Sequence, residues 1–126
     1  MIPRDLHPVL LRWAAVYPVL TLTGPRQSGK TTLCRAAFPD KPYISLEPLE
    51  TRSFALEDPR GFLAQYPDGA ILDEVQHAAS LLSYLQELVD RDPSPGRFIL
   101  TGSQHFGLSD AVSQSLAGRT AILHLL

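Results

Sequence analysis

The sequence predicts an α/β domain in which a parallel sheet of about five strands carries helices on both faces. Two observations lead to this expectation. Short apolar runs alternate along the chain with segments of amphipathic helical periodicity. Strands that alternate with helices form a parallel sheet, because each helix crosses a face of the sheet before the next strand begins. The 126 residues suit one compact domain, which we expect to span residues 1–126.

The predicted strands are short apolar runs that end in turn residues, as buried strands of parallel sheets do. The first is followed by Gly24 and Pro25, and the fourth is preceded by a turn that contains Pro95 and Gly96. In chain order the five expected strands cover residues 19–22, 43–46, 70–72, 97–101 and 120–125.

The predicted helices are segments whose apolar residues recur every three or four positions. The clearest has Leu81, Leu82, Leu85 and Leu88 as its apolar stripe. The expected helices cover residues 4–16, 29–38, 78–90 and 108–116. Residues 49–66 are expected to be mainly helix and loop, interrupted at Pro59 and Gly61.

Composition and charge give no evidence for a nucleic-acid or membrane partner, although the net charge does not exclude a local basic patch. The net charge is −2, which gives no electrostatic footprint for nucleic acid or an anionic membrane. The longest uncharged part of the first apolar stretch, residues 13–23, is too short to cross a bilayer as a helix. The single cysteine, Cys34, cannot form an internal disulfide and is expected to be a small buried hydrophobe. We therefore expect a cytoplasmic protein without a membrane partner.

Residues 24–31 fit the pattern G-x-x-x-x-G-K-[ST], the phosphate-binding loop. Glycine permits a tight turn in which successive backbone N–H groups point at one anion, and the following helix adds its positive N-terminal end. Lys30 is expected to reach the β- and γ-phosphates, and the Thr31 hydroxyl to ligate Mg²⁺. The motif thus predicts ATP with Mg²⁺, bound by Gly24, Pro25, Arg26, Gln27, Ser28, Gly29, Lys30, Thr31 and Thr32.

Asp73 and Glu74 follow an apolar strand directly. Two carboxylates at the end of a buried strand are costly unless they have a function. Beside a phosphate loop, Asp73 is expected to hold Mg²⁺ and Glu74 to polarise the water that attacks the γ-phosphate. Glu74 and Lys30 are therefore expected to be catalytic residues, and Thr31 and Asp73 are the expected metal ligands.

Polar residues also follow the fourth strand. Ligands bind beyond the carboxyl ends of strands in open α/β sheets, so Thr101, Ser103 or Gln104 is expected to sense the γ-phosphate. The alternative for each is a turn or a helix N-cap. Arg119 is interpreted either as an arginine finger acting on a neighbouring subunit or as a surface arginine, with the surface role favoured. The histidines His7, His77, His105 and His124 have no metal-ligand spacing and are expected to be structural.

Four ordered motifs resemble a family of prokaryotic AAA-type ATPases: GPRQSGKTT at 24–32, ILDEVQ at 71–76, FILTGSQ at 98–104 and SLAGR at 115–119. The resemblance covers nearly the whole chain. It implies a P-loop fold of the ASCE type, in which the strand before Asp73 is not adjacent to the first strand. It assigns Lys30 and Thr31 to Walker A, Asp73 and Glu74 to Walker B, and Ser103 or Thr101 to the first sensor. The resemblance thus adds Ser103 to Glu74 and Lys30 as an expected catalytic residue. Family members usually continue into a lid, a second sensor and a C-terminal domain, which are expected to lie outside this chain.

The main hypothesis is an ATP-binding AAA-type core that hydrolyses ATP to drive a conformational change, with homo-oligomerisation as an open alternative to a monomer. A nucleotide-binding module or switch without significant turnover is the second hypothesis. A small-molecule kinase is the third, and it is disfavoured because no arginine-rich lid segment is present. A GTPase is disfavoured further, because the sequence lacks an Asn-Lys-x-Asp motif for reading the base.

Overall fold

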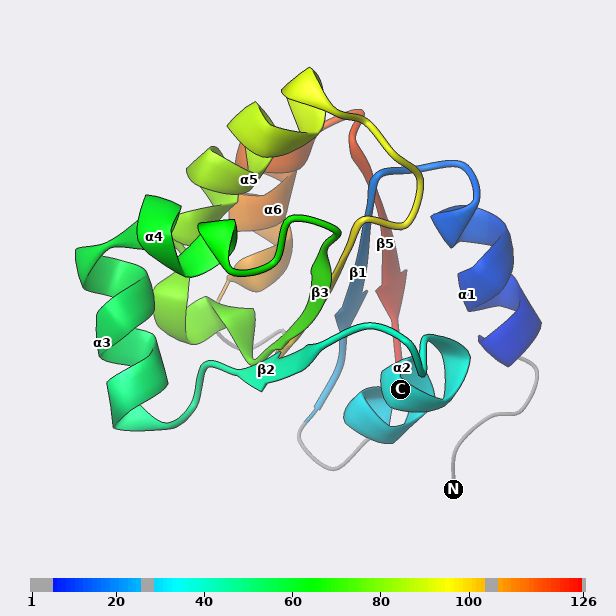
Figure 1. The fold of residues 1–126 in the computed structure, drawn as a ribbon. Helices are drawn as coiled ribbons and strands as arrows, with labels where there is room; N and C mark the ends of the chain where they lie inside the picture. Colours follow the sequence, from blue (N-terminus) through cyan, green and yellow to red (C-terminus); the bar gives the residue numbers. More distant parts are fainter. Residues whose placement is uncertain (1–5, 26–28, 104–106, 126) are drawn as a thin grey trace.

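A five-stranded parallel sheet lies between two layers of helices in the computed structural model, which describes residues 6–25, 29–103 and 107–125 (Figure 1). The order of strands across the sheet is β2-β3-β4-β1-β5. Every pair of neighbours is parallel, so the predicted α/β class is confirmed. The strands are β1 (Val19–Thr23), β2 (Tyr43–Ser45), β3 (Ala70–Asp73), β4 (Phe98–Gly102) and β5 (Thr120–His124).

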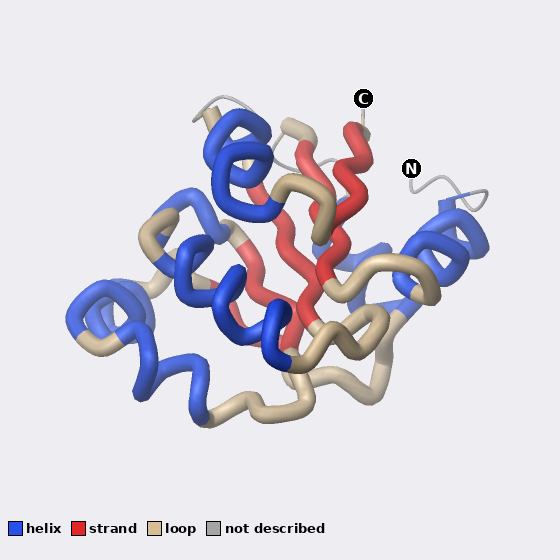
Figure 2. The backbone as a smooth tube through the Cα atoms, turned by 90° about the horizontal axis from the view of Figure 1, so that it is seen from above, coloured by secondary structure: helices blue, strands red, loops and turns tan. Residues whose placement is uncertain are grey.

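Helices cover both faces of the sheet, as Figures 1 and 2 show. One face carries α1 and α2, and the other carries α3, α4, α5 and α6. The helices are α1 (Leu6–Ala14), α2 (Lys30–Ala37), α3 (Leu49–Glu57), α4 (Pro59–Ala64), α5 (Leu81–Arg91) and α6 (Leu108–Leu116), with a 3₁₀ turn η1 (Val75–Ala78). No helix among these residues combines the length and the apolarity that a membrane crossing requires.

Alternate residues of each strand serve the two layers, which explains why the strands are apolar throughout. Leu20 of β1 and Ile99 of β4 pack in the cluster beneath α1 and α2. Their neighbours Val19 and Leu100 pack in the larger cluster beneath α5 and α6. All four side chains are completely buried. The sheet is thus the shared wall of two apolar cores and a rigid support for the ends of its strands.

Two predicted boundaries were wrong. Gly61 does not interrupt the chain but lies inside α4, where the Asp58 carboxylate caps the helix by accepting a hydrogen bond from the Gly61 backbone N–H at 3.0 Å. The fifth helix does not begin at Ala78 but at Leu81, because the chain first forms the 3₁₀ turn η1. That turn follows Glu74, whose backbone is left-handed at φ 57°, and sequence periodicity carries no signal for such a change of direction.

The position of β4 between β1 and β3 confirms the strand order that the family resemblance implied. Because all five strands run in the same direction, their carboxyl ends meet at one edge of the sheet. The polar segments after β1, β3 and β4 are brought together there, although they are far apart in the sequence.

Candidate functional site

The loop after β1 leads into α2 through Gly29. This glycine has φ 83° and ψ 8°, a left-handed conformation that glycine adopts without steric cost. It is the N-cap residue of α2, and no side chain caps the helix there. The backbone N–H groups of the first turn therefore remain available to a ligand, which an anion suits best. Gly24 and Pro25 are described, whereas the predicted contacts of Arg26, Gln27 and Ser28 lie outside the described residues.

Lys30 opens α2 and is almost completely buried, with 3% of its surface exposed. Its ammonium group donates a hydrogen bond to the Pro25 carbonyl oxygen at 3.3 Å. Its Nζ also lies 3.7 Å from Oε1 of Glu74. A buried ammonium needs oxygen partners on all three of its donors. The lysine therefore sits between the loop and the acidic pair, as a phosphate-binding lysine must.

Three hydroxyl groups surround the Asp73 carboxylate at the end of β3. Thr31 donates to Oδ1 at 3.0 Å, Thr101 donates to the same oxygen, and Tyr43 donates to Oδ2. Burial, followed by the hydrogen bond to Asp73, raises the pKa of the Tyr43 hydroxyl above its ordinary value, so the group stays protonated and donates. Asp73 is only 5% exposed, and these donors offset the cost of its burial.

Glu74 has an unusual backbone. At φ 57° and ψ 48° it is the one non-glycine residue in the described part of the chain with a positive φ, and such conformations concentrate at functional sites. The Glu74 N–H donates to the Thr101 hydroxyl at 3.3 Å. Its carboxylate faces Lys30 through Oε1 and accepts a hydrogen bond from Gln76 Nε2 through Oε2 at 2.6 Å. The side chain is thus held from two sides and aimed at the start of α2.

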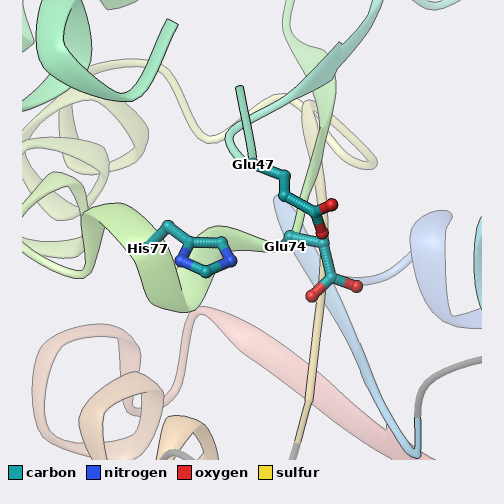
Figure 3. Close-up of side chains that lie close together, drawn as sticks. All are labelled: Glu47, Glu74 and His77. Carbon is teal, nitrogen blue, oxygen red and sulfur yellow. The ribbon is translucent and has the colours of Figure 1, made fainter. Parts of the chain in front are cut away.

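Two further ionisable side chains approach Glu74 (Figure 3). One ligand atom each from Glu47, Glu74 and His77 lie within 4.8 Å of one another. The Nε2 atom of His77 is buried without a hydrogen-bond partner in the described structure. Two carboxylates and an imidazole are donors that a divalent transition metal accepts. Because the group includes Glu74, it belongs to the same site, and a metal ion there would compete for the Glu74 carboxylate.

The structure brings most of the predicted site residues together. Lys30, Thr31, Asp73 and Glu74 contact one another directly or through a shared partner. Ser103 is buried at the same edge, and its N–H donates to Gln76 Oε1 at 3.3 Å. The Thr101 hydroxyl is engaged with Asp73 and Glu74. The prediction for Gln104 lies outside the described residues.

Arg119 lies at the opposite edge of the sheet. It directly precedes β5, and its carbonyl oxygen accepts from the Val19 N–H where β1 begins. Its guanidinium forms a two-point ion pair with Asp90, at 2.6 and 3.0 Å, which raises the pKa of Arg119 and lowers that of Asp90. The favoured surface role fits this exposed ion pair, and the alternative role, as an arginine finger, would act on a neighbouring subunit.

Sequence reasoning missed four residues of the site: Tyr43, Glu47, Gln76 and His77. Tyr43 lies in β2 and Glu47 follows it, and the pairing of β2 with β3, with Ser45 opposite Asp73, is a tertiary contact that the sequence does not reveal. Gln76 stands in the motif at 71–76, which contained the only available signal. His77 comes close to Glu74 because of the left-handed turn, and no spacing rule anticipates it.

The comparisons with known proteins agree with this geometry. Residues 16–126 match the family model described as AAA domain. Uncharacterized proteins of Mycobacterium tuberculosis and Mycobacterium bovis are each 38% identical over 125 residues. The match takes in 97% of this chain, which spans 28% of the length of those relatives.

Solved structures support the fold alone, because their sequence identities are low. The Walker-type ATPase of Pyrococcus abyssi aligns with a TM-score of 0.61 at 19% identity, over 96% of this chain and 53% of that one. Domain III of the Thermotoga maritima replication initiation protein DnaA aligns with a TM-score of 0.58 at 19% identity, over 97% of this chain and 61% of that one. With its P-loop sheet and the family match over residues 16–126, the chain belongs to the AAA-domain family of P-loop ATPases.

Proposed function

We propose that this chain is an ATPase core that binds ATP with Mg²⁺ and hydrolyses it to drive a conformational change. The observation that carries the proposal is the convergence of Lys30, Thr31, Asp73 and Glu74 on the uncapped start of α2. These residues come from two separate segments, the start of α2 and the end of β3, and include a buried cation and two buried carboxylates. The cost of burying them is explained by a site that handles phosphate and metal.

The residues present fit both ligands. The uncapped N-terminus of α2 and the buried Lys30 suit the phosphates. The Thr31 hydroxyl and the Asp73 carboxylate, 3.0 Å apart, are the hard oxygen donors that Mg²⁺ accepts, directly or through water. When bound, Mg²⁺ would neutralise charge on the phosphate oxygens.

Each protein group has a proposed role. Lys30 binds the terminal phosphates, and Thr31 and Asp73 hold the metal. Glu74 orients the attacking water and accepts its proton, since its carboxylate is aimed at the start of α2. Thr101 fixes Asp73 and the Glu74 backbone, which leaves Ser103 as the favoured sensor among the described candidates.

One observation favours a second candidate, a nucleotide-binding switch with little turnover. Glu74 Oε1 lies 3.7 Å from Lys30 Nζ, and a carboxylate that stayed paired with this lysine would not serve water. Binding is common to the two candidates, and hydrolysis separates them.

The proposal extends to the cytoplasm as the site of action and to assembly of several copies of the chain. An arginine from a neighbouring copy would supply the positive charge that Arg119 cannot supply within its own domain. Light scattering with and without ATP and Mg²⁺ checks the assembly, and an unchanged monomer mass would contradict it.

Lys30→Ala tests the binding site directly. We expect this variant to lose at least about 100-fold in ATP affinity, because the buried charge that contacts the phosphates is gone. Arg91→Ala is the matched control, since it removes a positive charge from an exposed residue at the end of α5. Titration with a fluorescent ATP analogue in the presence of Mg²⁺ measures both. Equal affinity of Lys30→Ala and the control would exclude the proposed phosphate site.

A further inference from the structure

Gln76 belongs to the motif at 71–76 and contacts Glu74, but it binds neither phosphate nor metal in the proposed function. It lies in η1, two residues after Glu74 and half-buried. The left-handed backbone of Glu74 turns the chain at this point, so that the two side chains meet instead of projecting in different directions. The Gln76 amide consequently reaches both the Glu74 carboxylate and the segment that follows β4.

Both ends of the Gln76 amide are in use. Nε2 donates to Glu74 Oε2 at 2.6 Å, and Oε1 accepts from the Ser103 N–H at 3.3 Å. A backbone N–H can only donate and an ionised carboxylate can only accept, so this orientation of the amide is the one that satisfies both partners. Glutamate at position 76 would lose the donor, and asparagine would be one methylene too short to bridge the same gap.

Gly102 leaves the space in which the amide sits. A Cβ atom at this position would lie 2.5 Å from Gln76 Oε1 and 2.3 Å from Cδ2 of Leu108. Any side chain at 102 would therefore displace both the Gln76 amide and the end of the Leu108 side chain. Gln76 thus packs against Gly102 and is hydrogen-bonded to Ser103, between the ends of β3 and β4.

We propose that Gln76 is a positioning residue, which holds the Glu74 carboxylate in its catalytic orientation and links it to the position of Ser103. The inference rests on the proposed role of Glu74. Gln76 fixes Oε2, and Oε1 is left facing Lys30. Because the Gln76 amide is rigid, a shift of the Ser103 backbone moves the Glu74 carboxylate. The segment that would sense the γ-phosphate therefore also sets the orientation of the carboxylate that activates water.

Single-turnover hydrolysis of ATP with Mg²⁺ and a binding titration test this role. For Gln76→Ala and Gln76→Asn we expect the hydrolysis rate to fall on the order of 10- to 100-fold, with the ATP affinity within about threefold of the parent. Gln114→Ala, an exposed glutamine of α6, is the control. Circular dichroism and thermal unfolding confirm that each variant is folded.

The pH profile of Gln76→Glu separates positioning from a purely structural role. An ionised carboxylate at position 76 repels Glu74, whereas a protonated one can donate as the amide does. Hydrolysis by this variant should therefore recover relative to the parent as the pH is lowered from 8 to about 5.5. An unchanging ratio across this range would count against the proposal.

Gly102→Ala gives an independent approach to the same contact. It should slow hydrolysis by displacing the amide, and it should add little to the effect of Gln76→Ala, because the two changes break one connection. A parent rate in Gln76→Ala, with Glu74→Gln inactive, would overturn the inference and leave the proposed function intact.

An inactive parent would instead remove the proposed function, and the contact is then tested by NMR. The side-chain amide signals of Gln76, identified by their loss in Gln76→Ala, should shift when Glu74 is replaced by glutamine, because a charge-assisted hydrogen bond is lost. Signals unchanged by that replacement would refute the contact itself.

Discussion

At the scale of single residues, the most constrained group is the Asp73 carboxylate. A buried carboxylate without partners would be strongly destabilising, by several kcal/mol. Here Thr31, Tyr43 and Thr101 each donate a hydrogen bond to it. Thr101 also accepts from the Glu74 N–H, so one hydroxyl orients both acidic residues. The acidic pair is therefore held in place by protein donors, which is the pre-organisation that phosphate chemistry requires.

Cys34 shows how the same surroundings act on a thiol. It is completely buried in α2, and burial, with a smaller contribution from Asp73, raises its pKa from 9.0 to about 12. Below pH 9 the thiol is protonated in both the folded and the unfolded chain, and its contribution to stability is constant. Between pH 9 and about 12 only the unfolded chain loses the proton, so the free energy of unfolding falls as the pH rises.

The prediction for Cys34 is a steeper alkaline loss of stability in the parent than in Cys34→Ala. Each unit of pKa difference corresponds to about 1.4 kcal/mol at full titration. Urea unfolding of both proteins at pH 8, 9.5 and 10.5 measures the difference, and the tyrosines titrate equally in each. Parallel pH profiles for the two proteins would show that the thiol titrates as an exposed one does.

At the scale of elements, close packing around β3 depends on one glycine. Gly69 precedes β3 with φ +96°, and a Cβ atom there would lie 1.6 Å from the Arg97 carbonyl oxygen. Arg97 precedes β4. The backbones of the segments that lead into β3 and β4 are therefore in contact. A side chain at position 69 would force the strands apart at the end remote from the site.

Gly69→Ala should lower the free energy of unfolding by more than about 2 kcal/mol, because it combines a backbone clash with a strained φ. Gly118→Ala is the matched control: its φ is +79°, but no atom lies within 4 Å of the added Cβ. It should cost only about 1 kcal/mol for the conformation. Urea unfolding compares the two, and an equal loss would show that the contact with Arg97 is not tight.

The sequence predicted the helices and strands better than it predicted the turns between them. The helix at 108–116 was predicted with its observed bounds, because three of its apolar residues, Leu108, Val112 and Leu116, recur at helical spacing on the buried face. The turn after Glu74 could not be predicted, since a left-handed glutamate is imposed by tertiary contacts. The same applies to Tyr43, whose contact with Asp73 depends on which strand pairs with β3.

At the scale of the whole molecule, the parallel sheet explains why the candidate site lies at one edge of the sheet. The carboxyl end of every strand lies at that edge, so the described residues of the three motifs, 24–25 with 29–31, 71–76 and 98–103, meet there. The opposite edge holds the ion pair of Arg119 with Asp90. The alternation of apolar runs with amphipathic segments predicted the fold, and the motif sequence predicted that Lys30 and Thr31 lie beside Asp73 and Glu74. It could not predict Gln76 or His77 as neighbours of Glu74, because those contacts follow from the path of the chain between elements.

Glu74 is proposed to activate the attacking water, and without its carboxylate the site would bind ATP but not hydrolyse it. Single-turnover hydrolysis of ATP with Mg²⁺, run beside a binding titration, tests this role on the parent and on Glu74→Gln. We predict that both bind ATP with similar affinity and that the variant hydrolyses it at least about 100-fold more slowly, the usual effect of losing a general base. Hydrolysis by Glu74→Gln at the parent rate would contradict the account, and a parent that binds ATP without hydrolysing it would favour the nucleotide-binding switch.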